Sequence, residues 1–208
     1  VFESGFVKNK VLEFAGPGVA GLSVDFRNGI DVMTTETTCL TSIWVTDEKV
    51  REHYELHRRP EGYRTLQPGK VAYYDAMIRI DLSTQESMIA LPFHPSNAYT
   101  IHELQAQPES ILRKVEEEAR ARYGEKVKVD LLSKIHDGGV WADQGIIAGC
   151  SGGTYENLSQ AAAILQDQSC GNDYFNLSVF PQSIPVSVAT TRNGINEELL
   201  EAGAVIKP

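Results

Sequence analysis

The sequence predicts an α/β fold with mostly parallel sheets, divided into two subdomains. Short apolar runs alternate with helical patterns, which is typical of strand–helix units whose strands pair in parallel. The alternation is clearest from residue 128 onward. A long amphipathic pattern at residues 107–126 follows a loop, and we place the subdomain boundary in that loop, near residue 105. The two predicted subdomains are therefore residues 1–105 and 106–208.

The elements expected in the first subdomain are short. Two helices are predicted, at residues 22–33 and 48–59. The second has Asp47 as its N-cap and Pro60 just beyond its end. Apolar, β-branched and aromatic residues predict strands at residues 10–14, 39–45 and 73–83.

The end of the first subdomain carries two contrasting patterns. Residues 73–83 alternate apolar side chains with others, which indicates a half-buried strand. Residues 90–104 contain Pro92 and Pro95, so we expect an ordered loop there rather than a helix or a strand.

In the second subdomain we expect strands and helices in alternation. The helix at residues 107–126 has acidic residues early, apolar residues at helical spacing and Gly124 just past its last turn. Further helices are predicted at residues 154–168 and 195–203, the latter ended by Gly203. The predicted strands are residues 128–135, 143–150, 176–181 and 204–208.

Composition narrows the class of protein. The chain has 208 residues, 42% hydrophobic and 23% charged, which is typical of a globular protein with a buried core. A net charge of -9 without a basic stripe argues against nucleic-acid binding. We find no signal-peptide pattern and no apolar run of 18 residues, so no membrane association is expected. Three widely spaced cysteines do not indicate a disulfide framework and favour the cytoplasm.

The stretch AGCSGGTYENL places Cys150 where a predicted strand meets a predicted helix. Ligands of parallel sheets bind beyond the carboxyl ends of strands, and a helix N-terminus favours the thiolate, which binds metals or attacks electrophiles. Gly152 and Gly153 would let a bulky group approach the backbone. Alternatively, Cys150 is a small apolar residue at a strand end and the glycines serve only the turn.

A cysteine-dependent hydrolase is a further alternative from the residues. It requires a base near Cys150, and His136 is the only histidine in the second half of the chain. A lone loop histidine is also typical of an ordinary surface residue. The chain has no P-loop, no His-Glu-x-x-His, no Gly-x-Ser-x-Gly and no Cys-x-x-Cys motif.

Four segments, in order, resemble the aconitase superfamily. The segment with Cys150 resembles that family's Ser-Cys-Thr-Asn-Ser stretch, which leads through Tyr-Glu into an alanine-rich helix. The others resemble its Gly-x-Gly start with a downstream Glu, its Asp-Leu-Ser stretch with following prolines, and its Glu-Ala-Gly-Ala segment. The four segments are residues 148–166, 13–44, 73–104 and 180–206.

The resemblance implies a hydro-lyase that dehydrates and hydrates a small hydroxy-carboxylic acid at a [4Fe–4S] cluster. In this family three cysteines hold three irons and the fourth iron acts as a Lewis acid. Cys150 matches the first cysteine. The other two belong to a Cys-x-x-Cys motif that the sequence, ending at Pro208, does not contain, and neither Cys39 nor Cys170 lies in such a motif. The implied fold is aconitase-like, with two three-layer α/β/α subdomains matching the family's second and third domains.

The resemblance also assigns site residues. Cys150 is the expected metal ligand, Glu36 matches a family glutamate expected to act catalytically beside the iron, and Ser151 and Gly152 are the expected substrate-binding positions. An ordinary solvated carboxylate is the alternative for Glu36. Gly152 and Val32 stand where aconitase itself has asparagines. Each lost charge-assisted hydrogen bond is worth about 1.5–3 kcal/mol, so we expect a substrate other than citrate.

We therefore expect the chain to be an internal fragment of a larger hydratase. Without the family's N- and C-terminal domains, which are its expected partners, it should bind no stable cluster and should be inactive. The alternative is a stand-alone binding or scaffold module that kept the fold and lost the chemistry. The RNA-binding role of some family members finds no support at a net charge of -9.

Overall fold

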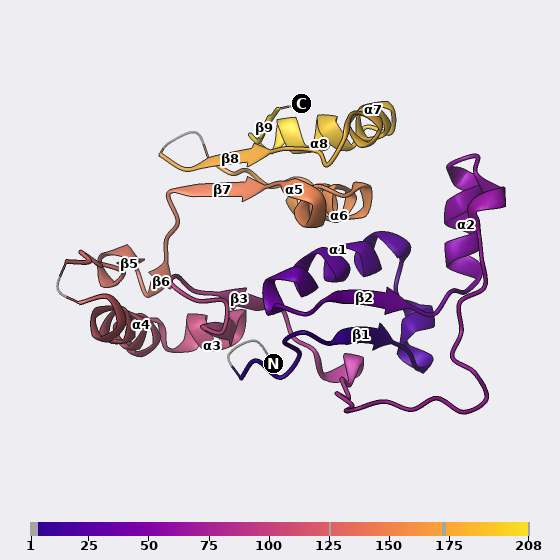
Figure 1. The fold of residues 1–208 in the computed structure, drawn as a ribbon. Helices are drawn as coiled ribbons and strands as arrows, with labels where there is room; N and C mark the ends of the chain where they lie inside the picture. The colour runs from indigo at the N-terminus through magenta and orange to yellow at the C-terminus, as the bar shows by residue number, and fades with distance from the viewer. Residues whose placement is uncertain (1–3, 125, 172–173, 208) are drawn as a thin grey trace. The chain divides into compact units, whose positions relative to one another are not determined.

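The computed structural model describes residues 4–124, 126–171 and 174–207, in two compact units (Figure 1). Unit 1 combines Val1–Ile78 with Gln144–Pro208, and unit 2 is Arg79–Asp143. The predicted boundary near residue 105 falls inside unit 2, because unit 2 is inserted between two segments that pack together. That residues 1–105 and 106–208 correspond to the second and third domains of the aconitase-type proteins stays a prediction.

The first segment of unit 1 is a parallel βαβ arrangement. β1 and β2 pair in parallel, with Val11 opposite Thr41 and Phe14 opposite Trp44. The Phe14 and Trp44 rings stack with their centroids 4.2 Å apart. The helices and strands are β1 (Val11–Phe14), η1 (Pro17–Gly21), α1 (Val24–Thr34), η2 (Thr35–Thr37), β2 (Thr41–Trp44), α2 (Glu48–Leu56) and η3 (Pro60–Gly62). The predicted strands 10–14 and 39–45 and helices 22–33 and 48–59 are confirmed, with small shifts of their ends.

A buried ion pair joins α1 to the start of α2. Arg27 is 2% exposed, and its guanidinium donates to both carboxylate oxygens of Asp47, at 3.1 and 2.6 Å, and to the carbonyl oxygen of Val19. Asp47 also caps α2 by accepting the N–H of Val50, as predicted. The Arg27 hydrogen bond holds the pKa of Asp47 below its usual range. The predicted cap residue therefore also neutralises a buried charge.

The second segment of unit 1 carries a three-stranded parallel sheet in the order β7-β8-β9. Helices α6 and α8 pack on it through fully buried Leu158, Leu199 and Val179. The elements are β7 (Gln144–Ile147), α5 (Gly149–Gly152), α6 (Tyr155–Leu165), β8 (Asn176–Val179), α7 (Ile184–Arg192), α8 (Ile195–Glu201) and β9 (Val205–Ile206).

The sequence predictions for this segment hold except at three points, the first being that the strand predicted at residues 143–150 ends at Ile147 and that Gly149 and Cys150 lie in the helix α5. The strands at β7, β8 and β9 and the helices at α6 and α8 are confirmed, and Pro208 at the end of the last predicted strand lies outside the described residues. Helix α7 was not predicted, although Ser183 caps it and Pro185 lies in its first turn. β7 was expected to be buried, but alternate residues along it are exposed. The α/β class with parallel sheets is confirmed.

Unit 2 is built around α4 (Pro108–Tyr123). Its core contains Leu91 and Leu104, together with Ile111, Leu112 and Val115 from α4. Gly124 ends α4 with a φ of 75°, as predicted, and Glu125 lies outside the described residues. The other elements are η4 (Leu82–Thr84), β3 (Met88–Ala90), β4 (Ala98–Thr100), α3 (Ile101–Ala106), η5 (Leu132–Lys134), β5 (Ile135–His136) and β6 (Gly139–Val140).

Residues 90–104 are not the loop that their prolines predicted. They include β4 and α3, and β4 pairs antiparallel with β3. A capping box starts α3, in which Thr100 accepts the N–H of Glu103 and the Glu103 carboxylate accepts the N–H of Thr100. The Thr-x-x-Glu spacing was the available signal for this helix. Pro92 and Pro95 do not prevent it, because both precede its first residue, Ile101.

A buried glutamate replaces the strand predicted at residues 128–135. The Glu116 carboxylate, on a residue 4% exposed, accepts the N–H of Leu131 at 2.6 Å and of Leu132 at 3.1 Å. Arg120 donates to its other oxygen at 2.7 Å. The backbone N–H groups that a strand would pair with a neighbour are thus taken by a side chain, and only β5 forms, at the end of the predicted range.

Residues 73–83 form no strand either. They are exposed throughout, and only η4 lies within the range. Their alternating pattern resembles that of a strand, but the chain bends at Asp75 and no neighbouring strand pairs with the segment among the described residues. Among all the residues that the structure describes, no helix is both long enough and apolar enough to cross a lipid bilayer.

We expect Glu116→Gln to destabilise the protein and to change its pH dependence. Burial raises the pKa of Glu116, but the Leu132 and Leu131 N–H groups and Arg120 outweigh it and lower the pKa from 4.5. Stabilisation is therefore complete above the unfolded pKa of 4.5 and is lost as pH falls through the lower folded pKa. At pH 7 the variant should lose about 1–3 kcal/mol, and below that unfolded value its deficit should shrink.

Urea unfolding across this pH range measures both effects. Glu117→Gln is the matched control, because Glu117 is the exposed neighbour on α4 and its change should stay within about 0.5 kcal/mol. Equal losses in the two variants would contradict the role given to Glu116.

Candidate functional site

Cys150 lies in a short helix just beyond β7. The strand ends at Ile147, and α5 holds the thiol one turn before α6 begins at Tyr155. Gly149 enters α5 with a φ of 81°, a left-handed conformation that favours glycine. Cys150 is exposed. The thiol therefore lies at the carboxyl end of a parallel strand, as predicted, but in α5 and not directly at the start of α6. We call residues 149–153 the Cys150 turn.

The two glycines after Cys150 have different roles. A Cβ on Gly153 would lie 2.5 Å from the carbonyl oxygen of Phe180 and 2.8 Å from the nitrogen of Gln182, so only glycine fits. The Gln182 N–H donates to the Gly153 carbonyl at 2.8 Å, which fastens the turn to the chain after β8. A Cβ on Gly152 would have no atom within 4 Å. Gly153 is thus required by the fold, and Gly152 leaves open space beside Cys150.

Ser151 connects the Cys150 turn to α1 and α6. Its carbonyl oxygen accepts the Asn157 side-chain N–H at 2.7 Å, and its hydroxyl lies 3.4 Å from the carbonyl oxygen of Gly29. A Cβ on Gly29 would lie 3.7 Å from two Ser151 oxygens, so the helix approaches the turn closely. Sequence reasoning selected Ser151 but missed Gly29 and Asn157. A glycine inside a helical pattern, at Gly29, was the signal for this close approach.

Val32 and Glu36 follow Gly29 at helical spacing. They are three and seven residues further along, which places them on the same side of α1 and its 3-10 extension η2. Val32 is half-buried and Glu36 is exposed. The geometry thus brings the helix that carries both residues against the Cys150 turn. It leaves open whether the Glu36 carboxylate acts there or is an ordinary solvated group.

Two hydrogen bonds join the starts of α1 and α6. The Ser23 hydroxyl, which caps α1, donates to the Glu156 carboxylate in the first turn of α6. In return the Glu156 N–H donates to the Asp25 carboxylate at 3.2 Å. We call these three residues the interlock. It joins segments more than 120 residues apart in the chain, and sequence reasoning did not find it because each residue alone is an ordinary helix-start residue.

The other candidate residues lie elsewhere. The Cys39 thiol donates to the Thr34 carbonyl oxygen at 3.2 Å, and the Cys170 N–H donates to the Ala202 carbonyl. His136 belongs to unit 2, where its ring meets the Trp141 ring edge-on with centroids 5.2 Å apart. Within the part of the chain that the structure describes, no three His, Cys, Asp or Glu side chains are grouped so that they could hold a metal ion.

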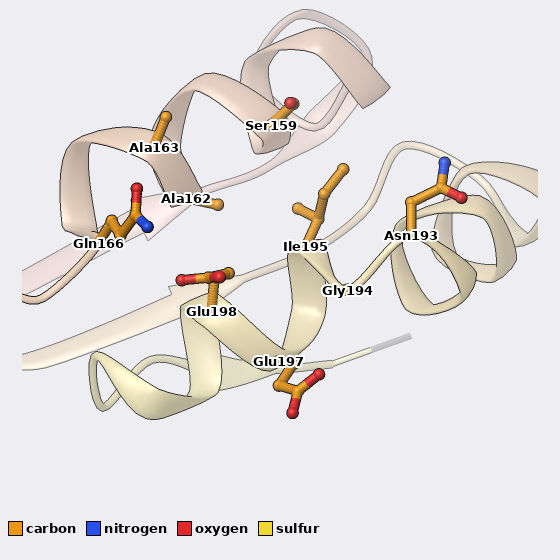
Figure 2. A pocket seen from close by; sticks show the side chains of 9 residues that line it. All are labelled: Ser159, Ala162, Ala163, Gln166, Asn193, Gly194, Ile195, Glu197 and Glu198. Atoms are coloured by element: carbon orange, nitrogen blue, oxygen red, sulfur yellow. The ribbon is translucent and has the colours of Figure 1, made fainter.

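A hollow of about 260 Å³ lies between α6 and α8 (Figure 2). Ile195 extends from α8 toward α6. The hollow is lined by the second half of α6 and the start of α8. Its lining includes neither Cys150 nor any other residue of the predicted site. The hollow has no cysteine or histidine, so the Cys150 turn remains the candidate site.

We expect Gly153→Ala to destabilise unit 1 and Gly152→Ala to leave it intact. The added methyl at residue 153 meets backbone atoms that cannot rotate away, so overpacking should cost about 1–3 kcal/mol. The methyl at residue 152 points into open space within α5, and its effect should stay within about 0.5 kcal/mol. Denaturant unfolding of both variants measures the difference. Equal stabilities would mean that the turn does not hold this conformation in solution.

Comparison with known proteins covers the whole chain. The model of the aconitase family (aconitate hydratase) matches residues 1–208. A 3-isopropylmalate dehydratase large subunit from Methanopyrus kandleri is 29% identical over 197 residues, which are 95% of this chain and 39% of that relative. The 2,3-dimethylmalate dehydratase large subunit from Eubacterium barkeri is 27% identical over 195 residues, 94% of this chain and 38% of that relative.

A more similar but shorter match is the protein named aconitase htyD from Aspergillus rugulosus. It is 39% identical over 104 residues, which are 48% of this chain and 12% of that protein. The chain thus spans about two fifths of the length of the two dehydratase subunits and a smaller share of the third relative.

Proposed function

This chain belongs to the aconitase family, and we propose that it is part of an iron–sulfur hydro-lyase that reversibly dehydrates a hydroxy-carboxylic acid. Two relatives that match nearly the whole chain are named as dehydratases of substituted malates, which supports the reaction class. The observation that carries the proposal is the placement of Cys150. Cys150 is exposed and lies at the carboxyl end of a parallel strand. It stands beside Gly152, which has open space at its Cβ position, and the turn that holds it packs against α1, the helix that leads to Glu36.

The residues of this chain do not fit a complete [4Fe–4S] site. Such a cluster in this family takes three cysteine thiolates, and the described residues contain no group of three metal-binding side chains. We propose that Cys150 supplies one ligand and that parts of a longer parent protein supply the others. The chain's two-fifths share of its relatives' length supports this reading. We expect the chain alone to be inactive.

The proposal gives three neighbouring residues distinct roles. Glu36 would present its carboxylate on the side of α1 that faces the Cys150 turn, as a catalytic acid or base. Ser151 and Gly152 would border the substrate. The Ser151 hydroxyl is only weakly engaged, at 3.4 Å from the Gly29 carbonyl, so it remains able to donate to a substrate carboxylate.

We propose a substrate less charged than citrate. Gly152 has no side chain, and Val32 offers only an apolar one on the face of α1 that meets the turn. A site with few polar side chains cannot compensate the desolvation of an additional carboxylate. The substituted malates in the relatives' names carry alkyl groups, and that class fits an apolar Val32.

Three unpaired cysteines support a cytoplasmic location.

Anaerobic reconstitution with ferrous iron and sulfide tests the role of Cys150. After removal of excess reagents the chain should retain little iron, and the iron–thiolate absorption that remains should disappear in Cys150→Ser. Cys170→Ser is the matched control and should leave the absorption unchanged, because Cys170 lies beside Ala202 and outside the Cys150 turn.

Two outcomes would overturn parts of the proposal. A full-occupancy, stable cluster in the isolated chain would show that no further ligands are needed. Iron retention that is the same in Cys150→Ser as in the unmodified chain would instead support a module that kept the fold and lost the chemistry.

A further inference from the structure

Two histidines lie one helical turn apart at the C-terminal end of α2. His53 belongs to the last turn of the helix and His57 is its C-cap. The centroids of their rings are 4.3 Å apart, and the ring planes are inclined by 37°. Both residues belong to unit 1, and neither contributes to the candidate site around Cys150. Histidines at positions i and i+4 of a helix share one face, and in the His-Glu-x-x-His motif such a pair binds zinc. The chain lacks that motif, but His53 and His57 have its spacing.

A hydrogen bond of His57 determines which of its ring nitrogens is free. Its Nδ1 lies 2.8 Å from the carbonyl oxygen of His53. A carbonyl oxygen only accepts hydrogen bonds, so Nδ1 carries a proton and donates it. In the neutral ring Nε2 then keeps its lone pair, which is what a metal ion binds. Metal-bound histidines commonly donate their second ring nitrogen to a backbone carbonyl in this way. The His57 ring therefore already has the tautomer of a metal ligand.

His53 is half-buried beside that ring. Burial and the neighbouring His57 lower the pKa of His53 from 6.5, and the Asp25 carboxylate, which raises it, does not offset them. At neutral pH the His53 ring is accordingly uncharged. A neutral imidazole binds a metal ion without first having to release a proton. Both rings are therefore ready to act as ligands.

The end of α2 also suits a positive charge. The C-terminus of a helix carries the negative end of its dipole, which favours cations there. The Asp25 carboxylate of α1 adds a negative charge that His53 senses. Arg58 and Arg59 follow the helix, but both are exposed, so solvent and salt screen them. Arg59 also lies 4.0 Å from the Glu61 carboxylate.

We propose that His53 and His57 form a binding site for one divalent transition-metal ion of the zinc type. Imidazole nitrogens suit zinc, nickel and copper ions. Among the described residues no three metal-binding side chains are grouped, so the pair supplies two ligands and water takes the other positions. The ion links the last turn of α2 to its cap and thereby stabilises the helix. This site is independent of the proposed hydro-lyase function.

Calorimetric titration with zinc chloride at neutral pH tests the site. The Cys150→Ser variant is the reference, because the exposed Cys150 thiol is itself able to bind zinc. The reference should bind one zinc ion per chain. Adding His53→Ala or His57→Ala should weaken binding by about tenfold or more, since loss of even an outer hydrogen-bond partner costs about 10–100-fold in metal affinity.

Two control variants, made in the same reference, separate the pair from histidine content. Glu52→His/His53→Ala keeps the number of histidines but moves one of them by a residue, which is about 100° around the helix. It should bind zinc as weakly as His53→Ala does. His102→Ala removes an exposed histidine of α3 in unit 2 and should leave the affinity unchanged.

Thermal unfolding supplies a second measurement. An ion that binds only the folded chain raises the free energy of unfolding. Zinc should therefore raise the unfolding midpoint of the reference, and EDTA should reverse the change. The midpoint of His53→Ala should not respond to zinc, although the variant itself should still unfold cooperatively.

Three results would overturn the proposal. The first is a reference that shows neither binding heat nor a change of midpoint in excess zinc. The second is equal affinity in the reference and in His53→Ala, which would place the zinc on other groups, such as the thiols of Cys39 and Cys170. The third is equal affinity in the reference and in Glu52→His/His53→Ala, which would show that the histidines do not act as a pair.

Discussion

The pair of hydrogen bonds between the starts of α1 and α6 holds the candidate site together. Ser23, Asp25 and Glu156 join two segments that are separated in the chain by the whole of unit 2. The Asp25 carboxylate accepts the Glu156 N–H, which the start of α6 leaves unpaired within its own helix, so this bond caps α6 as it joins the two helices. With the starts of the helices held together, Gly29 in the middle of α1 reaches Ser151 in the Cys150 turn. The side of α1 that carries Gly29 thereby packs against the Cys150 turn.

Steric limits at glycine complete the site. Gly149 turns the chain out of β7 in a left-handed conformation, and Gly153 lets it return against the backbone after β8. Between them Cys150 stands exposed, with only open space at the Cβ of Gly152. The turn is therefore fastened at Gly153 to the chain after β8 and has no side chain at Gly152. These properties suit a large group bound at the thiol, and they explain why a cysteine in this position is flanked by glycines.

Local sequence signals were reliable wherever local chemistry decides the structure. Asp47 caps α2 and Gly124 ends α4 as predicted, because caps and left-handed ends depend on neighbouring residues. Helices α3 and α7 were missed although their caps are local, and two further failures involve partners that are distant in the chain or missing from it. Residues 128–135 have strand-forming side chains, but Glu116 accepts the N–H groups of Leu131 and Leu132. Residues 73–83 alternate as a strand does, but no second strand pairs with them among the described residues. The pattern predicted a strand and could not supply a neighbour.

Periodicity and capping predicted the α/β class and most helices and strands, and the resemblance of four ordered segments to the aconitase superfamily predicted the family and selected Cys150, Ser151 and Glu36 as candidate residues. These signals are properties of residues close together in the chain. The different roles of Gly152 and Gly153, and the position of α1 against the Cys150 turn, emerged from the folded chain alone. So did the division at 78/79 and 143/144 instead of near residue 105. Such features depend on which backbone atoms meet after the chain folds back on itself, and no local pattern encodes that meeting.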